Sequence, residues 1–228
     1  MQSNCLSVEP LETELGRKRQ INQSSCNKDF SCVNGFCPSF VTVEGGKLKK
    51  PKKAAVEKGA AQLPTENLPQ PTLPAIDQPY GILVTGIGGT GVVTVGQILA
   101  MAAHLEGKGC SVLDMSGLAQ KGGPVLSHVR LANRPEEIYS TRVGAGAADL
   151  VIGCDVIVTA SHDALSRMGE GRTHAAVNAT GTPTSAFVRN PDWQDPGASA
   201  TRTIRTACGS GNVDAIEAGK VATGFNGT

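Results

Sequence analysis

The stretch YGILVTGIGGTG at residues 80–91 is an apolar run that breaks directly into a glycine turn. A short apolar run bounded by glycine is typical of a buried strand. The following residues, Val92 to Leu105, carry apolar side chains near helical spacing, and Gly107 and Gly109 come next as stop signals. The sequence therefore predicts a strand, a glycine turn and a helix in that order, which is the first part of a strand–helix–strand unit.

Further short apolar or β-branched runs follow along the rest of the chain. They predict strands at residues 111–113, 125–131, 149–153, 175–178 and 213–218, a helix at 155–168, and a helix-like run from Val221. Strands that alternate with helices indicate an α/β domain with a mainly parallel sheet and flanking helices, of the Rossmann-like kind, over residues 80–228. Because the last run has no cap, we expect the domain to be cut short at its end.

The glycines of the turn are Gly86, Gly88, Gly89 and Gly91, in the pattern G-x-G-x-x-G. A strand before them and a helix after them give the context in which this pattern can cradle the phosphates of a nucleotide cofactor. Asp114 stands at the end of the second predicted strand, where a dinucleotide site needs a carboxylate. The other reading is a tight turn that packs strand against helix, in which a valine at Gly88 would collide with the start of the helix.

The residues before this domain differ in composition. Residues 1–46 are rich in Cys, Asn, Ser and Gly and lack aliphatic periodicity, so we expect them not to close a hydrophobic core unaided. Residues 47–79 begin with KLKKPKK and contain five further prolines from Pro64 to Pro79, which predicts an extended linker.

Seven cysteines occur, of which Cys5, Cys26, Cys32 and Cys37 fall in the first 37 residues. The run Cys26-x5-Cys32-x4-Cys37-Pro38 brings three thiolates close together, as an iron–sulfur cluster requires. A structural zinc site with Cys5 as the fourth ligand and unliganded thiols are the alternatives. Cys110 and Cys154 lie in or beside apolar runs, and Met101 and His104 lie on the first helix; we expect all four to be packing residues.

The bulk composition excludes several classes of protein. The chain has 21 Lys and Arg residues and 20 Asp and Glu residues, so its net charge is close to zero. No strong electrostatic field therefore favours a nucleic acid or a membrane as a partner. The sequence has neither a signal-peptide pattern nor an apolar run long enough for a bilayer, and we expect a cytoplasmic protein. The loop segment Gln120-Lys121 could bring an amide and a cation near the carboxyl ends of the strands, or it could be solvated.

Two long strings in this chain resemble one known family. Residues 3–46, SNCLSVEPLETELGRKRQINQSSCNKDFSCVNGFCPSFVTVEGG, resemble the iron–sulfur region of the fused bacterial indolepyruvate ferredoxin oxidoreductases. Residues 81–131, GILVTGIGGTGVVTVGQILAMAAHLEGKGCSVLDMSGLAQKGGPVLSHVRL, resemble the gamma-type domain of the same 2-oxoacid:ferredoxin oxidoreductase family. The likeness is thinner from Arg189 onward.

The resemblance implies oxidative decarboxylation of an aryl pyruvate with coenzyme A, the electrons leaving through 4Fe-4S clusters to ferredoxin. In the family, thiamine diphosphate carries out the bond breaking of the decarboxylation, and this cofactor and its magnesium are bound on other domains. The chain lacks the GDG motif that such a thiamine site carries. We therefore expect this piece to be inactive alone, to associate with the remaining domains or subunits, and to form a homo-oligomer when complete.

The same resemblance implies a ligand set. Family members carry a C-x2-C-x2-C group before the string that begins at Ser3, so we expect the iron–sulfur segment to be truncated at its start, with Cys5 as the last cysteine of that group. In two-cluster ferredoxins this arrangement pairs Cys5 with Cys26 and Cys32 and sends Cys37 to the other cluster. The rival reading is a Rossmann-type NAD(P)-binding oxidoreductase with a zinc-binding N-terminal module.

Overall fold

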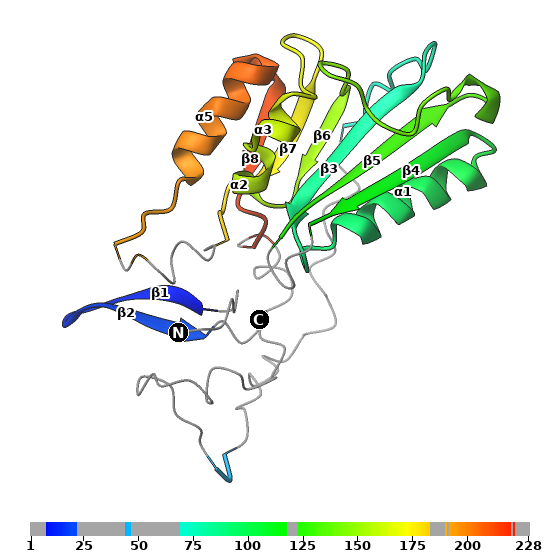
Figure 1. Cartoon of the computed structure of the whole chain (residues 1–228). Coiled ribbons are helices and arrows are strands. Elements are labelled where there is room, and N and C mark those ends of the chain that lie inside the picture. Colours follow the sequence, from blue (N-terminus) through cyan, green and yellow to red (C-terminus); the bar gives the residue numbers. More distant parts are fainter. Residues whose placement is uncertain are drawn as a thin grey trace.

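A central β-sheet with helices on both faces forms the main body of the computed structural model (Figure 1). The structure describes residues 8–21, 44–46, 69–117, 123–182, 190, 192–219 and 221. Its elements in chain order are β1 (Val8–Thr13), β2 (Gly16–Ile21), β3 (Tyr80–Ile87), α1 (Val92–Leu105), β4 (Gly109–Ser116), β5 (Pro124–Ala132), η2 (Pro135–Glu137), β6 (Leu150–Gly153), α2 (Val156–Thr159), α3 (His162–Leu165), β7 (His174–Asn178), α5 (Gly197–Cys208), η3 (Ser210–Asn212) and β8 (Val213–Ile216).

The six strands of the main sheet lie in the order β4-β5-β3-β6-β7-β8. Strands β3, β6, β7 and β8 pair in parallel, whereas β5 is antiparallel to both β3 and β4. Since β3 and β4 are both antiparallel to β5, every strand of the main sheet except β5 runs in the same direction. The prediction of an α/β domain with a mainly parallel sheet is confirmed, and β5 is inserted between the two strands of the first strand–helix–strand unit.

Helix α1 occupies the residues that the sequence predicts, because Gly91 and Gly107 both adopt the left-handed backbone that glycine favours. The single helix predicted at residues 155–168 is wrong. Two one-turn helices, α2 and α3, replace it, since the side chains of Asp155 and Ser161 each cap a new helix start. Helix α5 and the hairpin β1–β2 were not predicted.

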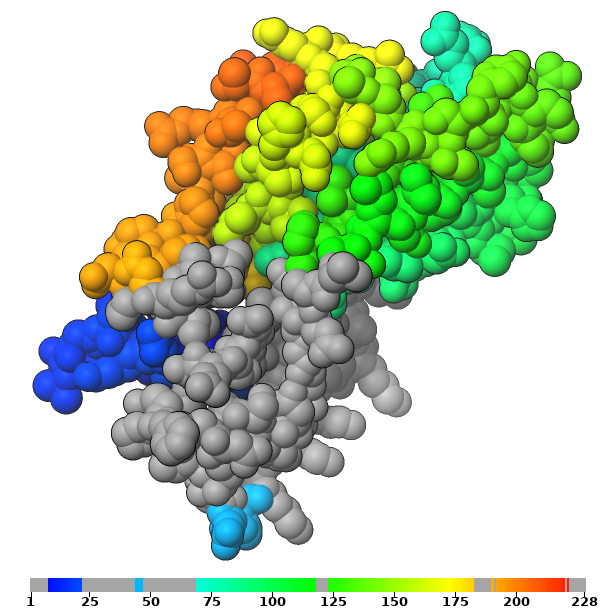
Figure 2. Space-filling model, in the orientation of Figure 1, coloured from blue at the N-terminus to red at the C-terminus, as the bar shows by residue number. Residues whose placement is uncertain are grey.

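The hairpin gives part of residues 1–46 a regular structure. Strands β1 and β2 pair from Val8 opposite Ile21 to Thr13 opposite Gly16. Arg17 Nη1 donates a hydrogen bond of 2.7 Å to the carbonyl oxygen of Trp193. The hairpin thus reaches the segment before α5, and Figure 2 shows its blue surface beside the orange one.

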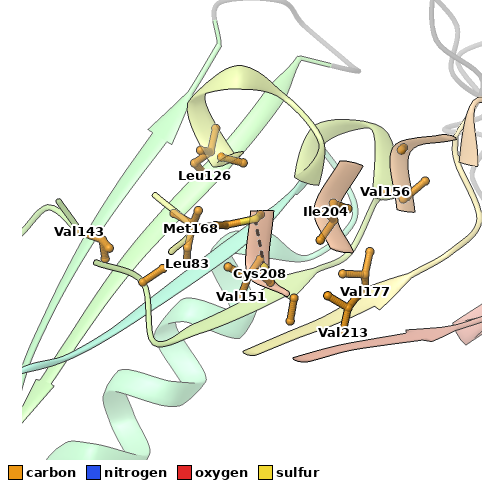
Figure 3. Close-up of a cluster of buried hydrophobic side chains, with 14 residues drawn as sticks. Leu83, Leu126, Val143, Val151, Val156, Met168, Val177, Ile204, Cys208 and Val213 are labelled. Carbon is orange, nitrogen blue, oxygen red and sulfur yellow. Dashed lines mark hydrogen bonds between the residues drawn. The ribbon is translucent and has the colours of Figure 1, made fainter. Parts of the chain in front are cut away.

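Each face of the sheet carries its own hydrophobic cluster. Under α1, a smaller cluster includes the fully or nearly fully buried Ile82, Val84 and Val129. On the opposite face, α2, α3 and α5 cover a larger cluster that Figure 3 shows, including Leu83, Val151, Val177, Ile204 and Cys208. The alternation of neighbours such as Ile82 and Leu83 between the two clusters follows from the two-residue period of a strand.

Two packing predictions on α1 are wrong. Met101 is 58% exposed, and His104 is also exposed, because both project from the side of α1 that faces away from the sheet. Among the described residues, no helix has the length and apolarity needed to cross a membrane.

A histidine is buried in the face of the sheet opposite α1. His128 is 1% exposed, and its Nδ1 atom accepts a hydrogen bond of 3.2 Å from the backbone N–H of Val143. Burial first, and then the positive charges of Arg142 and Arg167, lower the pKa of His128 to about 4. The imidazole is therefore neutral in the folded protein at neutral pH.

This buried histidine predicts a pH-dependent stability. Between pH 6.5 and about 4, the unfolded chain binds a proton at His128 that the folded chain excludes. The free energy of unfolding should therefore fall as the pH is lowered through this window, by on the order of 3 kcal/mol in total, with no contribution from His128 above pH 6.5. Urea unfolding followed by circular dichroism measures this change.

The matched variant is His128→Gln, which is uncharged at every pH. It should be less stable than the wild type at pH 8 but should show a shallower loss of stability between pH 6.5 and 4. Equal slopes for the two proteins in this window would show that His128 is not held neutral.

Candidate functional site

The carboxyl ends of β3, β6 and β7 meet at one edge of the sheet, because these strands are parallel neighbours. This edge brings together the glycine turn after β3, the pair Cys154-Asp155 after β6, and Asn178 at the end of β7. The start of β5 joins them, since Gly88 N–H donates a hydrogen bond of 3.0 Å to the carbonyl oxygen of Gly123. Open α/β sheets bind their ligands at such an edge.

The turn is closed by a threonine. Both the N–H and the Oγ1 hydroxyl of Thr90 donate to the carbonyl oxygen of Ile87, over 2.9 and 2.7 Å. Gly89 has a φ of +102° and Gly91 a φ of +83°, a region that other residues enter only with strain. Gly91 is the N-cap of α1 and offers no side-chain hydrogen bond to the first N–H groups of the helix. The turn could therefore present backbone donors to an anion, although packing alone also accounts for it.

Gly86 is the crowded position of this motif. A Cβ atom there would lie 2.7 Å from Val92 Cγ2 and 3.0 Å from Cys154 Cβ, and closer still to Thr90 Oγ1. Strand β3, helix α1 and strand β6 thus approach one another at a point where only glycine fits. Gly88, where the sequence predicted a collision, is not among the glycines with positive φ; the demonstrated close approach belongs to Gly86.

Asp155 is a buried hydrogen-bond acceptor beside the turn. It is fully buried, and its carboxylate accepts hydrogen bonds from three backbone N–H groups, those of Ile157 (2.9 Å), Val158 (3.0 Å) and Thr182 (2.8 Å). Two of these groups belong to the start of α2, and the third lies in the segment after β7. The carboxylate therefore joins two elements and has a structural role.

Cys154 is held in the same place by the backbone. Its N–H donates to the carbonyl oxygen of Thr85 over 2.7 Å, and its own carbonyl oxygen accepts from Asn178 Nδ2 over 3.2 Å. Burial first, and then the charge of Asp155, raise the pKa of the Cys154 thiol. A thiol with a raised pKa stays protonated at neutral pH, which argues against a nucleophile or a metal ligand here.

The remaining described cysteines are also packed, as expected for Cys110. Cys110 Sγ donates to the carbonyl oxygen of Ala100 over 3.5 Å, and Cys208 is fully buried against Met168. Burial raises the pKa of the Cys208 thiol to about 11. Both are packing residues in this arrangement.

Asp114 does not stand where a dinucleotide needs it. It lies on β4, and its partner across the pair is Ser127 of β5, so a whole antiparallel strand separates it from β3. Two strand spacings amount to about 10 Å. In a dinucleotide fold the carboxylate follows the strand next to the glycine turn. The geometry therefore gives the NAD(P) reading no support.

The predicted metal ligands Cys5, Cys26, Cys32 and Cys37 lie outside the described residues, as do Gln120 and Lys121. Within the described part of the chain, no cluster of three or more His, Cys, Asp or Glu side chains could hold a metal. The iron–sulfur site stays a prediction. Thiolates are the donors that iron–sulfur clusters require, so the donor set itself fits.

Asp155 and Asn178 lie at this edge but are not among the site residues that the sequence predicts. The signal for Asp155 was present, since an aspartate between a buried strand and an apolar run is a frequent helix N-cap. Asn178 gave no such signal, because its Oδ1 atom accepts from Ala218 N–H over 3.2 Å, a contact between distant parts of the chain.

Comparison with known proteins identifies the domain that contains this edge. Residues 81–221 match the family model described as pyruvate ferredoxin/flavodoxin oxidoreductase. The indolepyruvate oxidoreductase subunit IorB of Thermococcus kodakarensis is 32% identical over 78 residues, which cover 34% of this chain and 37% of that protein. Its counterpart in Methanothermobacter thermautotrophicus is 27% identical over 131 residues, covering 58% of this chain and 63% of that protein.

Other similar proteins are named for pyruvate. The common gamma subunit of the pyruvate/ketoisovalerate oxidoreductases of Pyrococcus furiosus is 43% identical over 53 residues, 23% of this chain and 29% of that protein. Among solved structures, the pyruvate oxidoreductase subunit PORC of Thermotoga maritima matches with a TM-score of 0.44 and 19% identity, covering 65% of this chain and 67% of that one. The chain spans only part of the curated relatives, from 37% to 63% of their length in these two IorB matches.

The crowding at Gly86 yields a test of the glycine turn. Gly86→Val should lower the free energy of unfolding by about 1–3 kcal/mol, because its methyl groups would overlap Val92 and Cys154. Gly211→Val is the matched control, since a Cβ atom at Gly211 meets nothing within 4 Å, and its effect should stay within about 0.5 kcal/mol. Thermal and urea melts of both variants measure this difference.

The same proteins test the nucleotide reading. Calorimetric titration of the wild type with NADH or NADPH should show no saturable binding. Micromolar binding that Gly86→Val removes while the melting temperature stays unchanged would show that the turn is a nucleotide site instead.

Proposed function

This chain belongs to the pyruvate ferredoxin/flavodoxin oxidoreductase family, and we propose that it is the gamma-type component of an indolepyruvate:ferredoxin oxidoreductase that also carries electron-transfer ligands. The complete enzyme would convert indolepyruvate and coenzyme A to indoleacetyl-CoA and carbon dioxide while reducing ferredoxin. The observation that carries the proposal is the family match over residues 81–221, which contains β3 to β8, the whole main sheet apart from the first residue of β3.

The choice of indolepyruvate follows from the relatives. Four IorB subunits match this chain over 74 to 131 residues. The pyruvate-type relatives match over 49 to 86 residues. The longest alignment is therefore with an indolepyruvate oxidoreductase subunit, which favours an aryl pyruvate as the substrate of the assembled enzyme.

The described domain fits a structural role in that enzyme, in which catalysis takes place elsewhere. At the edge of the sheet, Asp155 is fully committed to backbone hydrogen bonds and the Cys154 thiol is protonated, so neither side chain offers an acid, base or nucleophile. Decarboxylation would then use thiamine diphosphate and magnesium on another domain or subunit. The gamma-type domain would contribute packing surface to the assembly, and coenzyme A, ferredoxin and the other subunits would be its partners.

The N-terminal cysteines supply the redox part of the proposal. Cys5, Cys26 and Cys32 would ligate one 4Fe-4S cluster and Cys37 a second, and such a cluster when bound passes electrons one at a time. The thiolates of these residues would fix the cluster, and the hairpin β1–β2 lies between the first and second of them in the chain. The hydrogen bond from Arg17 to Trp193 links this hairpin to the gamma-type domain.

Iron content separates the clustered from the packed cysteines. Cys26→Ser and Cys32→Ser should each remove most of the iron and the broad visible absorption from anaerobically purified protein, because each removes a thiolate ligand. Cys110→Ala should leave both unchanged, since Cys110 packs on α1. Similar iron loss in all three variants, or a colourless wild type that contains zinc, would contradict the ligand assignment.

Substrate choice is tested on the assembled enzyme. The full set of domains or subunits that includes this chain should reduce ferredoxin with indolepyruvate and coenzyme A faster than with pyruvate, in specificity constant. A preference for pyruvate would keep the family and overturn the substrate.

A further inference from the structure

The face of the sheet that α2, α3 and α5 cover also carries four arginines (Figure 1). Arg142 and Arg202 are exposed, and Arg167 and Arg205 are half-buried. Among the described residues, no carboxylate forms an ion pair with any of the four. We call the surface that bears these side chains the arginine face.

Two of the arginines lie over the first half of the sheet. Arg142 Nη2 is 3.3 Å from Met115 Sδ on β4, and the N–H of the next residue donates to His128 on β5. Arg167 follows α3, and its carbonyl oxygen accepts a hydrogen bond of 2.9 Å from Ala148 N–H, just before β6. After burial, the positive charges of Arg142 and Arg167 are the causes that lower the pKa of His128. Both charges are therefore felt at the same buried atom.

Helix α5 carries the other two arginines over the far half of the sheet. It packs on α2 and β8, and it contains Arg202 and Arg205 but no acidic residue. Asp192 and Asp195 precede the helix, and Asp195 Oδ1 accepts a hydrogen bond of 2.9 Å from Gly197 N–H. Since β4 and β8 are five strand spacings apart, the arginine face is about 24 Å wide.

The charge of the domain is unevenly distributed. Residues 80–228 contain 11 Lys and Arg residues and 12 Asp and Glu residues, so the domain as a whole is nearly neutral. Two exposed carboxylates, Asp163 and Glu170, accompany the four arginines, which leaves an excess of positive charge on that side. On the opposite face, α1 has no charged residue, and Asp114 and Asp214 are exposed. A negatively charged partner is therefore attracted to the arginine face.

A groove runs between α3 and α5 within this face. Its volume is about 580 Å³, and its lining combines apolar Leu165 and Ala207 with Arg202 and three hydroxyl residues of α5. Thr203 Oγ1 and Thr206 Oγ1 each donate a hydrogen bond of 3.1 Å to a backbone carbonyl oxygen of their own helix. Both oxygens thus have lone pairs left for N–H donors of an occupant.

We propose that the arginine face docks a protein partner whose contact surface is rich in Asp and Glu, in a transient and salt-sensitive complex. The planar guanidinium group of arginine binds carboxylates through two parallel hydrogen bonds. A width of about 24 Å exceeds the reach of one small anion and is the scale of a standard protein interface, which buries about 800 Å² of each partner. The Ser, Thr and Arg residues on the outer side of α5 suit a transient contact, because permanent interfaces are more hydrophobic.

The same features disfavour two other occupants. A second copy that presented its own arginine face would place positive charges opposite each other. A nucleic acid would bring phosphate groups, which have no donors for the hydroxyl oxygens of Thr203 and Thr206, whereas an acidic protein also brings backbone N–H groups. The inference goes beyond the proposed function, and it holds whether or not the chain binds a cluster.

Binding of a decaglutamate peptide to the full chain tests the proposal. An extended peptide of ten residues is about 33 Å long and can span the arginine face. The linker lysines would attract the same peptide, so all five are first changed to Gln: Lys47→Gln, Lys49→Gln, Lys50→Gln, Lys52→Gln and Lys53→Gln. This change lowers the 21 Lys and Arg residues to 16, against 20 Asp and Glu residues. Saturable binding to a chain of net negative charge then requires a local cationic surface.

Variants of this background chain locate the contact. Calorimetric titration should show binding that weakens as salt is raised, because salt screens exposed charges. Arg142→Glu and Arg202→Glu should each raise the dissociation constant about fivefold or more, and their effects should multiply in the double variant, since the sites are far apart. Arg134→Glu is the matched control: Arg134 is exposed and pairs with Glu137 beside η2, and its replacement should change the constant less than about twofold.

Three outcomes would overturn the proposal. The first is a background chain that does not bind decaglutamate at low salt. The second is equal weakening by Arg134→Glu and the two face variants, which would show attraction without a site. The third is a decathymidylate oligonucleotide that binds more tightly than the peptide and is lost in the same variants, which would assign the face to phosphate groups. Circular dichroism melts that match the background chain separate loss of contact from loss of fold.

Discussion

Strand β3, the start of helix α1 and the residue after β6 meet at Gly86, where a side chain would have no room. A glycine here lets the helix begin directly above the strand, and Val92 and Cys154 then fill the space that a side chain would take. A second close approach lies one turn later, where a Cβ atom at Gly96 would come within 2.5 Å of Ser127 Oγ. These two glycines fix α1 flat against the sheet and determine which of its side chains face outward.

From that placement follows the asymmetry of the sheet. Helix α1 covers β3, β4 and β5, and the other helices lie on the opposite face, so one half-face has no cover within the described chain. On the opposite face, a buried hydroxyl pair joins strand to helix: Thr159 Oγ1 donates to the Asp155 carbonyl over 2.7 Å, which leaves Thr85 Oγ1 as the donor to Thr159 over 2.8 Å. Within the described residues, helices thus pack on both faces of β3, whereas β6, β7 and β8 carry helices on one face alone.

The sequence predicted the elements whose signals are local. Gly91 and Gly107 delimit α1, and the alternating run at 125–131 marks β5. Its antiparallel direction and its place between β3 and β4 depend on pairing between distant residues, which no local pattern contains. Helix α5 was missed because its Ser, Thr and Gly residues have low helix propensity, although the buried Gly197, Ala200, Ile204 and Cys208 follow helical spacing.

The candidate site divides in the same way. The pattern predicts the glycine turn, but its packing role depends on Cys154, the residue after β6, which lies against Gly86. Asp114 satisfied a spacing rule along the sequence and failed it in space, because β5 separates β4 from β3. A sequence motif thus predicts the local backbone conformation. The residues that pack against the motif are determined by the order of the strands in the sheet.

We propose that this chain carries electrons within a 2-oxoacid:ferredoxin oxidoreductase, and electron paramagnetic resonance can detect the cluster that this role requires. The spectrum of the full chain, purified without oxygen, is recorded before and after reduction with dithionite. The account predicts a signal of a reduced 4Fe-4S cluster that appears on reduction and disappears on reoxidation. A protein that contains zinc and gives no cluster signal in either state would contradict it.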